Sequence, residues 1–492
     1  MICRACGEAV RGLRTKWRGL RRSSAQAENE MEGLRSCGFG KGNFMNERDM
    51  TKGTPLTHIL LFAGPAFVSI LLQQLYNTVD TLIVGRFAGE NALSAVGTCA
   101  SMITVFLGAA VGFSTAASVI VSQYFGAGKK DEIHRISRVA VTFLLVVGLV
   151  VTAIGLVFAS MILEGFLGVP ETILPTAVLY FRIYCLGLFF QFGYNIVAAL
   201  LRSVGDSKAS MYFLLIASLA NVALDLLFVG AFHMGAAGAA VATGLSQGLS
   251  MTASFIYMNR NYEMFHFGWQ DFLWEQTVVG EIFRIGIPLV LQQMIIGIGI
   301  MSIQRAVNSF GEEMMASYAV ASRVELFVQM PINALQMALA TFVGQNIGAG
   351  NYDRVKMGTR QTLLTSVSLT AALAVLLILF RSPIISLFGI GAKAAVYCRS
   401  HLFVTSLAFI FQAMYLPLTG VFQGAGHSIA ITRVALTALS IRVITTYTLC
   451  HVAAIDYRIV WLNVIFGFSG ACLMAWGQYL KGTWKKKARV EV

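Results

Sequence analysis

Charged residues are scarce in this chain. Only 12% of its 492 residues are Asp, Glu, Lys or Arg, whereas a soluble domain carries about 25%. Hydrophobic residues make up 56% of the sequence, and the mean hydropathy is +0.69. A chain of this kind cannot cover its surface with polar groups in water, so lipid is its natural solvent. The composition excludes an ordinary soluble domain and predicts an integral membrane protein.

Motifs for enzyme chemistry are also missing. The sequence has no HExxH, no pair of CxxC motifs and no Ser-His-Asp arrangement at a predicted membrane face. Gly126-Ala-Gly128-Lys129 superficially resembles a phosphate loop, but Gln123 stands where that loop has its first glycine, and Lys130 replaces its Ser or Thr. We therefore expect neither an enzyme nor an ATP-driven pump, and no cofactor.

The first 44 residues lack an apolar core, which excludes a signal peptide. Cys3 and Cys6 form a CxxC and Cys37 is a third thiol, but a zinc site wants a fourth ligand and none is obvious. We expect residues 1–50 to be a basic, disordered extension, with Met45 as a natural start. The eight cysteines show no disulfide framework, and five lie in or near apolar segments as small packing residues: Cys99, Cys185, Cys398, Cys450 and Cys472.

Apolar stretches recur throughout residues 55–481. Each is about 20 residues or longer, the length that crosses a bilayer as a helix. Several exceed that length, which implies tilt or kinks. The pattern predicts an all-α integral membrane fold with twelve transmembrane helices, near residues 56–84, 91–123, 134–160, 172–200, 208–230, 236–259, 280–308, 314–345, 357–380, 393–422, 429–450 and 458–480.

The second half of the chain repeats the first at a shift of 222 residues. QYFGAG at 123–128 returns as QNIGAG at 345–350, and Gly64 returns as Gly286. The repeat predicts two homologous six-helix lobes. Because each half has an even number of helices, the repeats are parallel and related by a pseudo-two-fold axis along the membrane normal. The cleft between the lobes is the expected binding site.

Loop charges predict the orientation of the helices. We expect an N-terminal lobe at 51–259, a cytoplasmic linker at 260–279, a C-terminal lobe at 280–481 and a basic cytoplasmic tail at 482–492. Lys and Arg cluster in alternate connections and in the tail, which indicates that both termini are cytoplasmic. This placement accounts for the net charge of +13 and gives no reason to expect a nucleic-acid partner.

Several helices carry motifs in a characteristic order. They are Gly64-Pro65 with Gln73-Gln74-Leu-Tyr76-Asn77 and Asp80, LLRSVGDSK at 200–208, Asn221-Val-Ala-Leu-Asp225, GAAGAAVATGLSQ at 235–247, and Ala321-Ser-Arg323-Val-Glu325. Together they resemble the multidrug and toxic compound extrusion (MATE) family, nearer its prokaryotic DinF-like and NorM-like members, over roughly residues 50–480. The resemblance implies a secondary active exporter in the cell membrane. Such a protein antiports small organic compounds, often cationic, against inward H⁺ or Na⁺ by alternating access, and we expect it to act as a monomer among membrane lipids.

Two aspartates in predicted helices fall at a similar depth. Asp80 and Asp225 each lie near the outer end of a helix in the first lobe, and an ionisable group in a span costs about 2.5–3.5 kcal/mol. Asn221 lies one turn before Asp225 on the same face, and Thr243 lies at a similar depth. Two carboxylates with an amide and a hydroxyl suit Na⁺, or a proton shared between the carboxylates. The resemblance implies this same cation site, with the backbone near Ala239 contributing, although either aspartate could instead cap a helix or pair with an arginine.

Glu325, Arg323 and Pro65 each allow more than one interpretation. Glu325 and Arg323 point to different faces of their helix, so we expect Arg323 to pair elsewhere and Glu325 to face the interior of the second lobe, either as a functional group or in a structural ion pair. Pro65 removes one backbone hydrogen bond from its helix. The resemblance implies a hinge there, and a static kink fits the sequence equally well.

Substrate recognition is expected in the cleft. Six polar side chains lie in apolar helices near it: Gln73, Gln74, Tyr76, Asn77, Gln292 and Gln293. Twenty Met and 34 Phe offer an adaptable apolar wall for amphipathic cations. The alternative for these polar residues is ordinary interhelical hydrogen bonding. The alternative for the protein is a flippase for lipid-linked cell-wall or polysaccharide precursors, which would need a cleft richer in arginine.

Overall fold

The computed structural model describes residues 47–268, 270–452 and 461–487. The predicted extension up to residue 46, with Cys3, Cys6, Cys37 and Met45, lies outside the described residues, as does the end of the basic tail.

Twelve long α-helices make up most of the described residues, which confirms the predicted all-α fold. Ten of them are long and apolar enough, by length and composition, to cross a membrane. The other two are α7, which is rich in Gly, Ala and Ser, and the shorter α13. The helices are α2 (Pro55–Phe87), α3 (Gly89–Gly126), α4 (Lys130–Ser160), α5 (Leu174–Ser203), α6 (Ser207–Asp225), α7 (Gly235–Asn261), α8 (Gln276–Asn308), α9 (Glu312–Gly348), α10 (Tyr352–Ser386), α11 (Ala392–Gly424), α12 (Ser428–Val452) and α13 (Leu462–Leu480).

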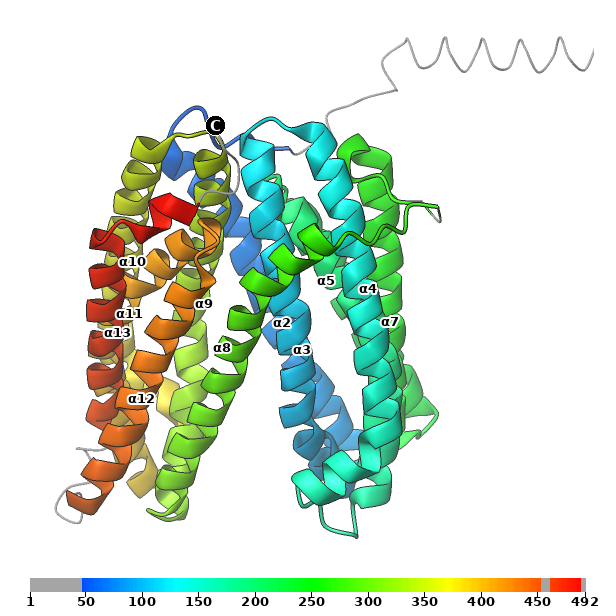
Figure 1. Cartoon of the computed structure of the whole chain (residues 1–492). Coiled ribbons are helices and arrows are strands. Elements are labelled where there is room, and N and C mark those ends of the chain that lie inside the picture. Colours follow the sequence, from blue (N-terminus) through cyan, green and yellow to red (C-terminus); the bar gives the residue numbers. More distant parts are fainter. Residues whose placement is uncertain (1–46, 269, 453–460, 488–492) are drawn as a thin grey trace, which may run out of the picture. The chain divides into compact units, whose positions relative to one another are not determined.

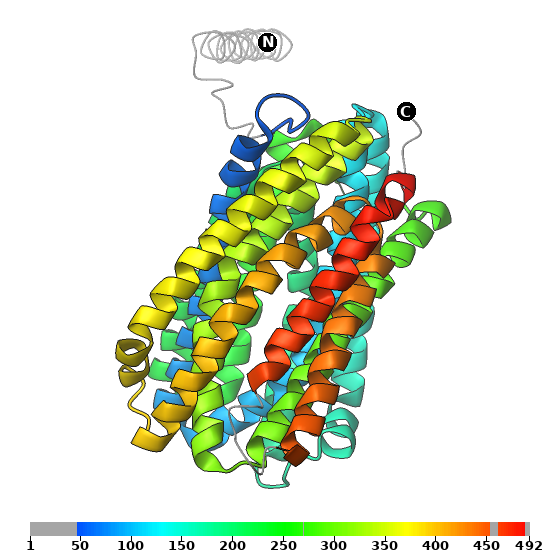
Figure 2. The same cartoon turned by 90° about the vertical axis from the view of Figure 1, so that its left-hand side faces the viewer.

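The helices form two lobes of six, α2–α7 and α8–α13 (Figure 1). Within the first lobe α5 packs against α3, α4 and α7, and within the second α11 packs against α9, α10 and α13. Turned by 90°, the second lobe shows its helices as long, tilted rods (Figure 2). Tilt is expected, because a helix of 33–38 residues is longer than the hydrocarbon core.

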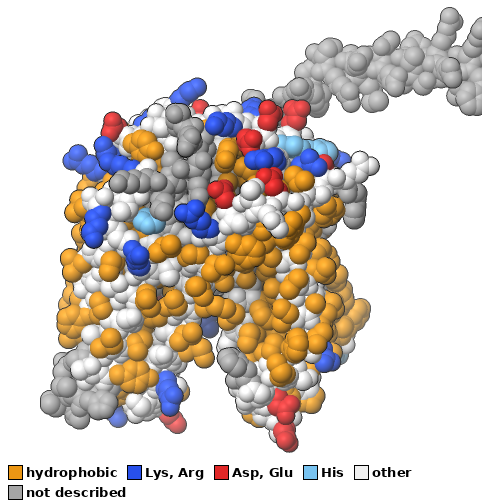
Figure 3. Space-filling model, in the orientation of Figure 1, with side chains coloured by type: hydrophobic (Ala, Val, Ile, Leu, Met, Phe, Trp, Pro, Cys, Tyr) orange, Lys and Arg blue, Asp and Glu red, His pale blue; other side chains and the backbone are white. Residues whose placement is uncertain are grey.

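The lobes meet on the side where α2 begins and α13 ends, which we call the terminal side. There α3 packs against α8 and α9, and α2 packs against α9. Toward the opposite side the lobes separate, and the space-filling view shows a hollow between them (Figure 3). The same view shows a broad hydrophobic band and a concentration of basic side chains on the terminal side.

Small residues bring helix backbones together within the first lobe. A Cβ atom added at Gly187 of α5 would lie 2.9 Å from the Cα atom of Gly244 in α7. Such close approach increases van der Waals contact between helices in lipid, where no hydrophobic effect drives their association.

Four of the predicted packing cysteines are indeed free and buried: Cys99, Cys185, Cys398 and Cys472.

The repeated QxxGAG sequences join the lobes on the terminal side. A Cβ atom at Gly126 would overlap the carbonyl group of Gln345, and one at Gly348 would overlap that of Gln123. The Gln123 amide donates to the carbonyl oxygen of Gly424 at 2.9 Å, and the Gln345 amide donates to that of Ser203 at 3.0 Å. These contacts are related by the sequence repeat. They explain why both halves carry the motif: its glycines and glutamines pack the two lobes tightly against each other.

Candidate functional site

The structure brings the four predicted cation-site side chains together in the first lobe. The carboxyl groups of Asp80 on α2 and Asp225 at the end of α6 are neighbours. Asn221 lies one turn before Asp225 and donates its amide to the hydroxyl oxygen of Thr243 on α7 at 3.4 Å. Asn221 and Asp225 are 0% exposed and Thr243 is 7% exposed. Ala239, one turn before Thr243, is buried as well.

Several oxygen atoms of this cluster lack a hydrogen-bond donor. Within the described part of the chain, both carboxylate oxygens of Asp225, one of Asp80 and the amide oxygen of Asn221 are buried and accept no hydrogen bond. A buried unsatisfied acceptor costs about 1–3 kcal/mol, and more when it is charged. A proton on one carboxyl group or a bound hard cation would remove that cost.

The donor set suits a small cation better than a transition metal. Among the described residues, no group of three or more His, Cys, Asp and Glu side chains could hold a metal ion. Two carboxylates, an amide oxygen and a hydroxyl are hard oxygen ligands of the kind that fit Na⁺, and the two neighbouring carboxyls also fit one shared proton.

The backbone changes its hydrogen-bond register directly after Asp225. The α-helix ends at this residue and continues as the π-helical turn η3 (Leu226–Ala231). Gly238 of α7 lies against this turn, because a Cβ atom there would come 3.1 Å from the Phe228 carbonyl carbon. Turns of this type are rare and are frequent at functional sites.

Tyr76 lies beside the aspartates, although its sequence position suggested the substrate cleft. Its hydroxyl group contacts the Thr243 side chain, and Asp80 and Tyr184 are close. Tyr76 thus lies in the carboxylate cluster, and its assignment to the substrate cleft remains a prediction. The spacing of four residues between Tyr76 and Asp80 is the signal that could have revealed this.

The other predicted cleft residues do not gather with Tyr76. Gln73 and Asn77 are exposed on α2, and Gln74 is half-buried. On α8, the exposed Gln293 faces α3, since its Cβ atom would lie 3.3 Å from a Cβ atom at Gly108, and its neighbour Gln292 is half-buried. The cleft assignment of these five residues remains a prediction.

Glu325 faces the interior of the second lobe, as predicted, but its partner is a histidine. One carboxylate oxygen lies 3.1 Å from Nε2 of His401 on α11. The His401 ring stacks on Trp461, with ring centroids 3.9 Å apart. Arg323 is exposed, and no ion pair or hydrogen bond of a described residue involves it, so the expectation that it pairs elsewhere is wrong. A lone histidine in an apolar segment was the available signal for His401.

Pro65 lies within α2, which remains helical from Pro55 to Phe87. The proline nitrogen cannot donate to the carbonyl group one turn earlier, and the Ser69 hydroxyl donates to the Pro65 carbonyl oxygen at 3.0 Å. A hinge at this position remains a prediction.

A small cavity lies between the lobes on the terminal side of the molecule. Its volume is about 40 Å³, whereas sites for drug-sized ligands usually measure about 300–1,000 Å³. The joint between the lobes is therefore closed to an organic substrate. Several lining residues are equivalent in the repeat. Ser118 and Val119 correspond to Ala340 and Thr341 at the shift of 222 residues, and Arg202 corresponds to Gln423 at a shift of 221.

A comparison with protein families agrees with the repeat and with the fold. The model of the family described as MatE matches residues 65–227 and, a second time, residues 288–448. This chain belongs to that family of multidrug and toxic compound extrusion transporters. The second match follows the first by about 222 residues, the shift at which the sequence repeats. The MATE-family chain is therefore a multi-pass membrane transporter rather than an enzyme.

Known relatives cover nearly the whole MATE-family chain. The probable multidrug resistance protein YpnP of Bacillus subtilis is 29% identical over 446 residues, which are 90% of this chain and 98% of the relative. The probable multidrug resistance protein NorM of Thermotoga maritima is 23% identical over 442 residues, 87% of this chain and 93% of the relative.

Solved structures confirm the two-lobe fold. A MATE protein in complex with MaL6 superposes with a TM-score of 0.84 at 22% identity and covers 90% of this chain and 100% of its own. An outward-facing multidrug resistance transporter of the MATE family gives a TM-score of 0.83 at 21% identity, with the same coverage of both chains. Twelve transmembrane helices in two lobes of six, related by a pseudo-two-fold axis along the membrane normal, are thus the fold of this protein.

Proposed function

We propose that this MATE-family transporter exports small organic compounds, often cationic, by antiport against inward H⁺ or Na⁺. The names of the relatives support multidrug export. The observation that carries the coupling is the cluster of Asp80, Asn221, Asp225 and Thr243, in which both carboxylate oxygens of Asp225, one of Asp80 and the amide oxygen of Asn221 are buried without a donor.

The proposed cycle couples neutralisation of this cluster to helix packing. A proton or Na⁺ entering from outside neutralises the Asp80–Asp225 pair and removes the repulsion between the two carboxylates. The lower charge favours a different packing of α2, α6 and α7, with Pro65 as the hinge in α2. Substrate leaves outward in that state, and release of the cation to the cytoplasm resets the transporter.

The proposed orientation puts both termini in the cytoplasm. Basic side chains gather on the terminal side, as positive-inside loops require (Figure 3). The hollow between the lobes then opens to the outside, and the closed joint of the QxxGAG motifs faces the cytoplasm. In this orientation one inward charge at 100 mV supplies about 2.3 kcal/mol, which supports a substrate gradient of roughly fifty-fold.

Substrate specificity is proposed to depend on the cleft walls. Gln73, Gln74, Asn77, Gln292 and Gln293 would supply hydrogen-bonding groups among adaptable Met and Phe side chains. Such a surface fits chemically varied amphipathic cations. We propose that a single chain carries out the whole cycle in the plasma membrane.

Proteoliposomes test this function directly. A proton gradient and a sodium gradient are imposed separately, and uphill movement of an organic cation dye is followed. The antiport proposal expects dye transport that depends on one of the two gradients and is lost in Asp225→Asn, while the exposed-surface control Asp353→Asn behaves as the wild type. Dye transport that ignores both gradients, beside a working reference antiporter, would contradict it and favour a flippase.

A further inference from the structure

The segment before α2 crosses the joint between the lobes. We call residues Arg48–Gly53 the N-terminal strap. At its start, the backbone N–H of Arg48 donates to the carbonyl oxygen of Val204 in the first lobe at 2.9 Å. Two residues later, the N–H of Met50 donates to the Gln345 side-chain oxygen in the second lobe at 2.9 Å. The strap is thus bonded to both lobes.

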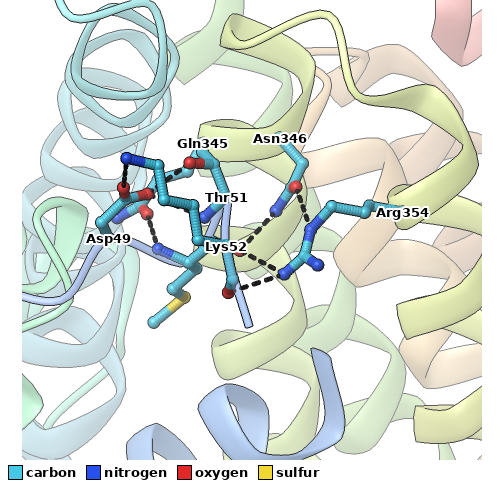
Figure 4. A network of polar contacts seen from close by, with 7 residues as sticks. Asp49, Thr51, Lys52, Gln345, Asn346 and Arg354 are labelled. Carbon is cyan, nitrogen blue, oxygen red and sulfur yellow. Dashed lines mark hydrogen bonds and ion pairs between the residues drawn. The ribbon is translucent and has the colours of Figure 1, made fainter. Parts of the chain in front are cut away.

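Arg354 at the start of α10 holds most of the strap (Figure 4). Its guanidinium group donates to the carbonyl oxygen atoms of Met50 at 3.0 Å, Lys52 at 3.0 Å and Gly53 at 2.7 Å. Its Nε donates to the Asn346 side-chain oxygen at 3.0 Å, and the Asn346 amide donates to the Met50 carbonyl at 3.2 Å. No salt bridge within the described chain involves Arg354, so its charge is directed at backbone carbonyl groups.

The linker before α8 makes the reciprocal contact. Residues 270–275 are the repeat equivalents of the N-terminal strap, and they bind to α4 of the first lobe. Arg138 pairs with Asp271 at 2.8 Å, Arg135 pairs with Glu275 at 3.1 Å, and the Leu273 N–H donates to the Thr142 hydroxyl at 3.2 Å. Each lobe is therefore held by the segment that leads into the first helix of the other.

These bonds lie where the lobes must separate if the transporter is to open to the terminal side. We propose that Arg354 is a positioning residue of the transport cycle. By fastening the N-terminal strap across the joint, it stabilises the conformation that is closed on the terminal side. The proposal rests on the transport function proposed above. Opening must break three hydrogen bonds from one guanidinium group, and a planar fork of donors is a geometry that a lysine ammonium reproduces only in part.

The chain offers a matched control for this arginine. Arg360 lies on the same helix, less than two turns further on, and is exposed. Among the described residues no ion pair or hydrogen bond involves it. Arg354→Ala and Arg360→Ala therefore remove the same charge from the same helix, and only the first removes bonds to the strap.

The test measures the distance between the lobes on the terminal side. In a full-length chain whose native cysteines are replaced, new cysteines at the exposed positions Lys130 and Lys481 carry spin labels. Pulsed electron–electron double resonance then gives the distribution of distances between the two labels. We expect Arg354→Ala to raise the ratio of terminal-side-open to closed molecules about tenfold, which corresponds to about 1.4 kcal/mol. Arg354→Lys should restore part of the closed population, and Arg360→Ala should match the unsubstituted protein.

A distance distribution in Arg354→Ala that equals that of Arg360→Ala would overturn the proposal. A variant that fails to fold would be recognised by its elution profile, and Asn346→Ala, which removes a single strap bond, then gives the same test with a smaller expected shift. Because the distances are measured without substrate or gradient, the result stands apart from the transport assay. If the wild type showed no gradient-driven export, the proposed function would be wrong. If Arg354→Ala left the distance distribution between the lobes unchanged, only the role of Arg354 would be wrong.

Discussion

The two lobes share a fold but differ at the positions where the first lobe carries its acidic cluster. Asp80 corresponds to Ser302 at the shift of 222 residues. From about residue 200 on the shift is 221, since Gly205 and Ser207 return as Gly426 and Ser428, so Asn221 corresponds to Arg442 and Asp225 to Thr446. The second lobe therefore has no carboxylate at these positions, and it has a fixed positive charge at one of them.

The buried carboxylate of the second lobe, Glu325, also has a different kind of partner. Glu325 is paired with His401, whose ring stacks on Trp461 and lies near the ring of Tyr318. Asp80 and Asp225 instead have each other as neighbours, and neither carboxylate belongs to an ion pair among the described residues. A buried charge with a partner is stable where it is, whereas two carboxylates side by side require a proton or a cation. This difference is the reason for proposing that coupling belongs to the first lobe and that Glu325 has a structural role in the second.

The largest effect is expected from Asp225→Asn. The amide cannot carry a negative charge, so the pair can no longer hold and release a cation. Gradient-driven dye export in proteoliposomes should fall at least a hundredfold, because the interaction of the charged Asp225 carboxylate with the cation contributes about 3 kcal/mol or more. Export with unchanged cation dependence in this variant would break the comparison between the lobes.

The repeat-related glycines at the joint should give the next largest effect. Gly126→Ala and Gly348→Ala each place a methyl group against a backbone carbonyl of the other half, so both should loosen the joint and lower export about tenfold. Gly97→Ala on the same helix as Gly126 meets no atom within 4 Å and serves as the control. Unequal effects of Gly126→Ala and Gly348→Ala would show that the two halves of the joint are not equivalent.

Glu325→Ala should affect stability more than coupling. Removing the carboxylate leaves His401 buried without its partner, which costs about 3–5 kcal/mol. The midpoint of thermal unfolding in detergent should fall, while export by the folded fraction keeps its response to the cation gradient. If the gradient response disappeared with the protein still folded, the second lobe would have a coupling role after all.

The smallest effect is expected from Tyr76→Phe. This change removes only the hydroxyl group beside Thr243, a contact worth about 0.5–1.5 kcal/mol. The cation concentration that gives half-maximal export should shift by roughly two- to tenfold, with the maximal rate unchanged. Tyr180→Phe, on α5 of the same lobe, removes a hydroxyl group without touching the Tyr76–Thr243 contact. An equal shift in this variant would indicate that the polarity of the region matters, and not the contact between Tyr76 and Thr243.

Much of this organisation could be predicted from the sequence because lipid imposes strong rules. Recurring apolar stretches locate the twelve helices, ten of which are long and apolar enough to cross a membrane, and the QxxGAG repeat locates the two lobes. Asp80, Asn221, Asp225 and Thr243 could be placed at one depth because a charged residue in a span is rare and therefore informative.

Side-chain partners could not be predicted in the same way. The pairing of Glu325 with His401 joins helices more than seventy residues apart, and the place of Tyr76 depends on the rotation of α2, which apolar periodicity fixes poorly in a helix with lipid and protein on several sides. The N-terminal strap was missed because its bonds use backbone carbonyl groups, for which the amino-acid sequence carries no signal beyond Arg354 itself.

Direct measurement of cation binding tests the central difference between the lobes. Purified protein is titrated with Na⁺ by calorimetry, and proton uptake or release is recorded in weakly buffered solution. We expect cation binding or a titrating proton in the wild type, its loss in Asp225→Asn, and its persistence in Glu325→Gln. Binding that survives Asp225→Asn and disappears in Glu325→Gln would contradict the assignment of the coupling site to the first lobe.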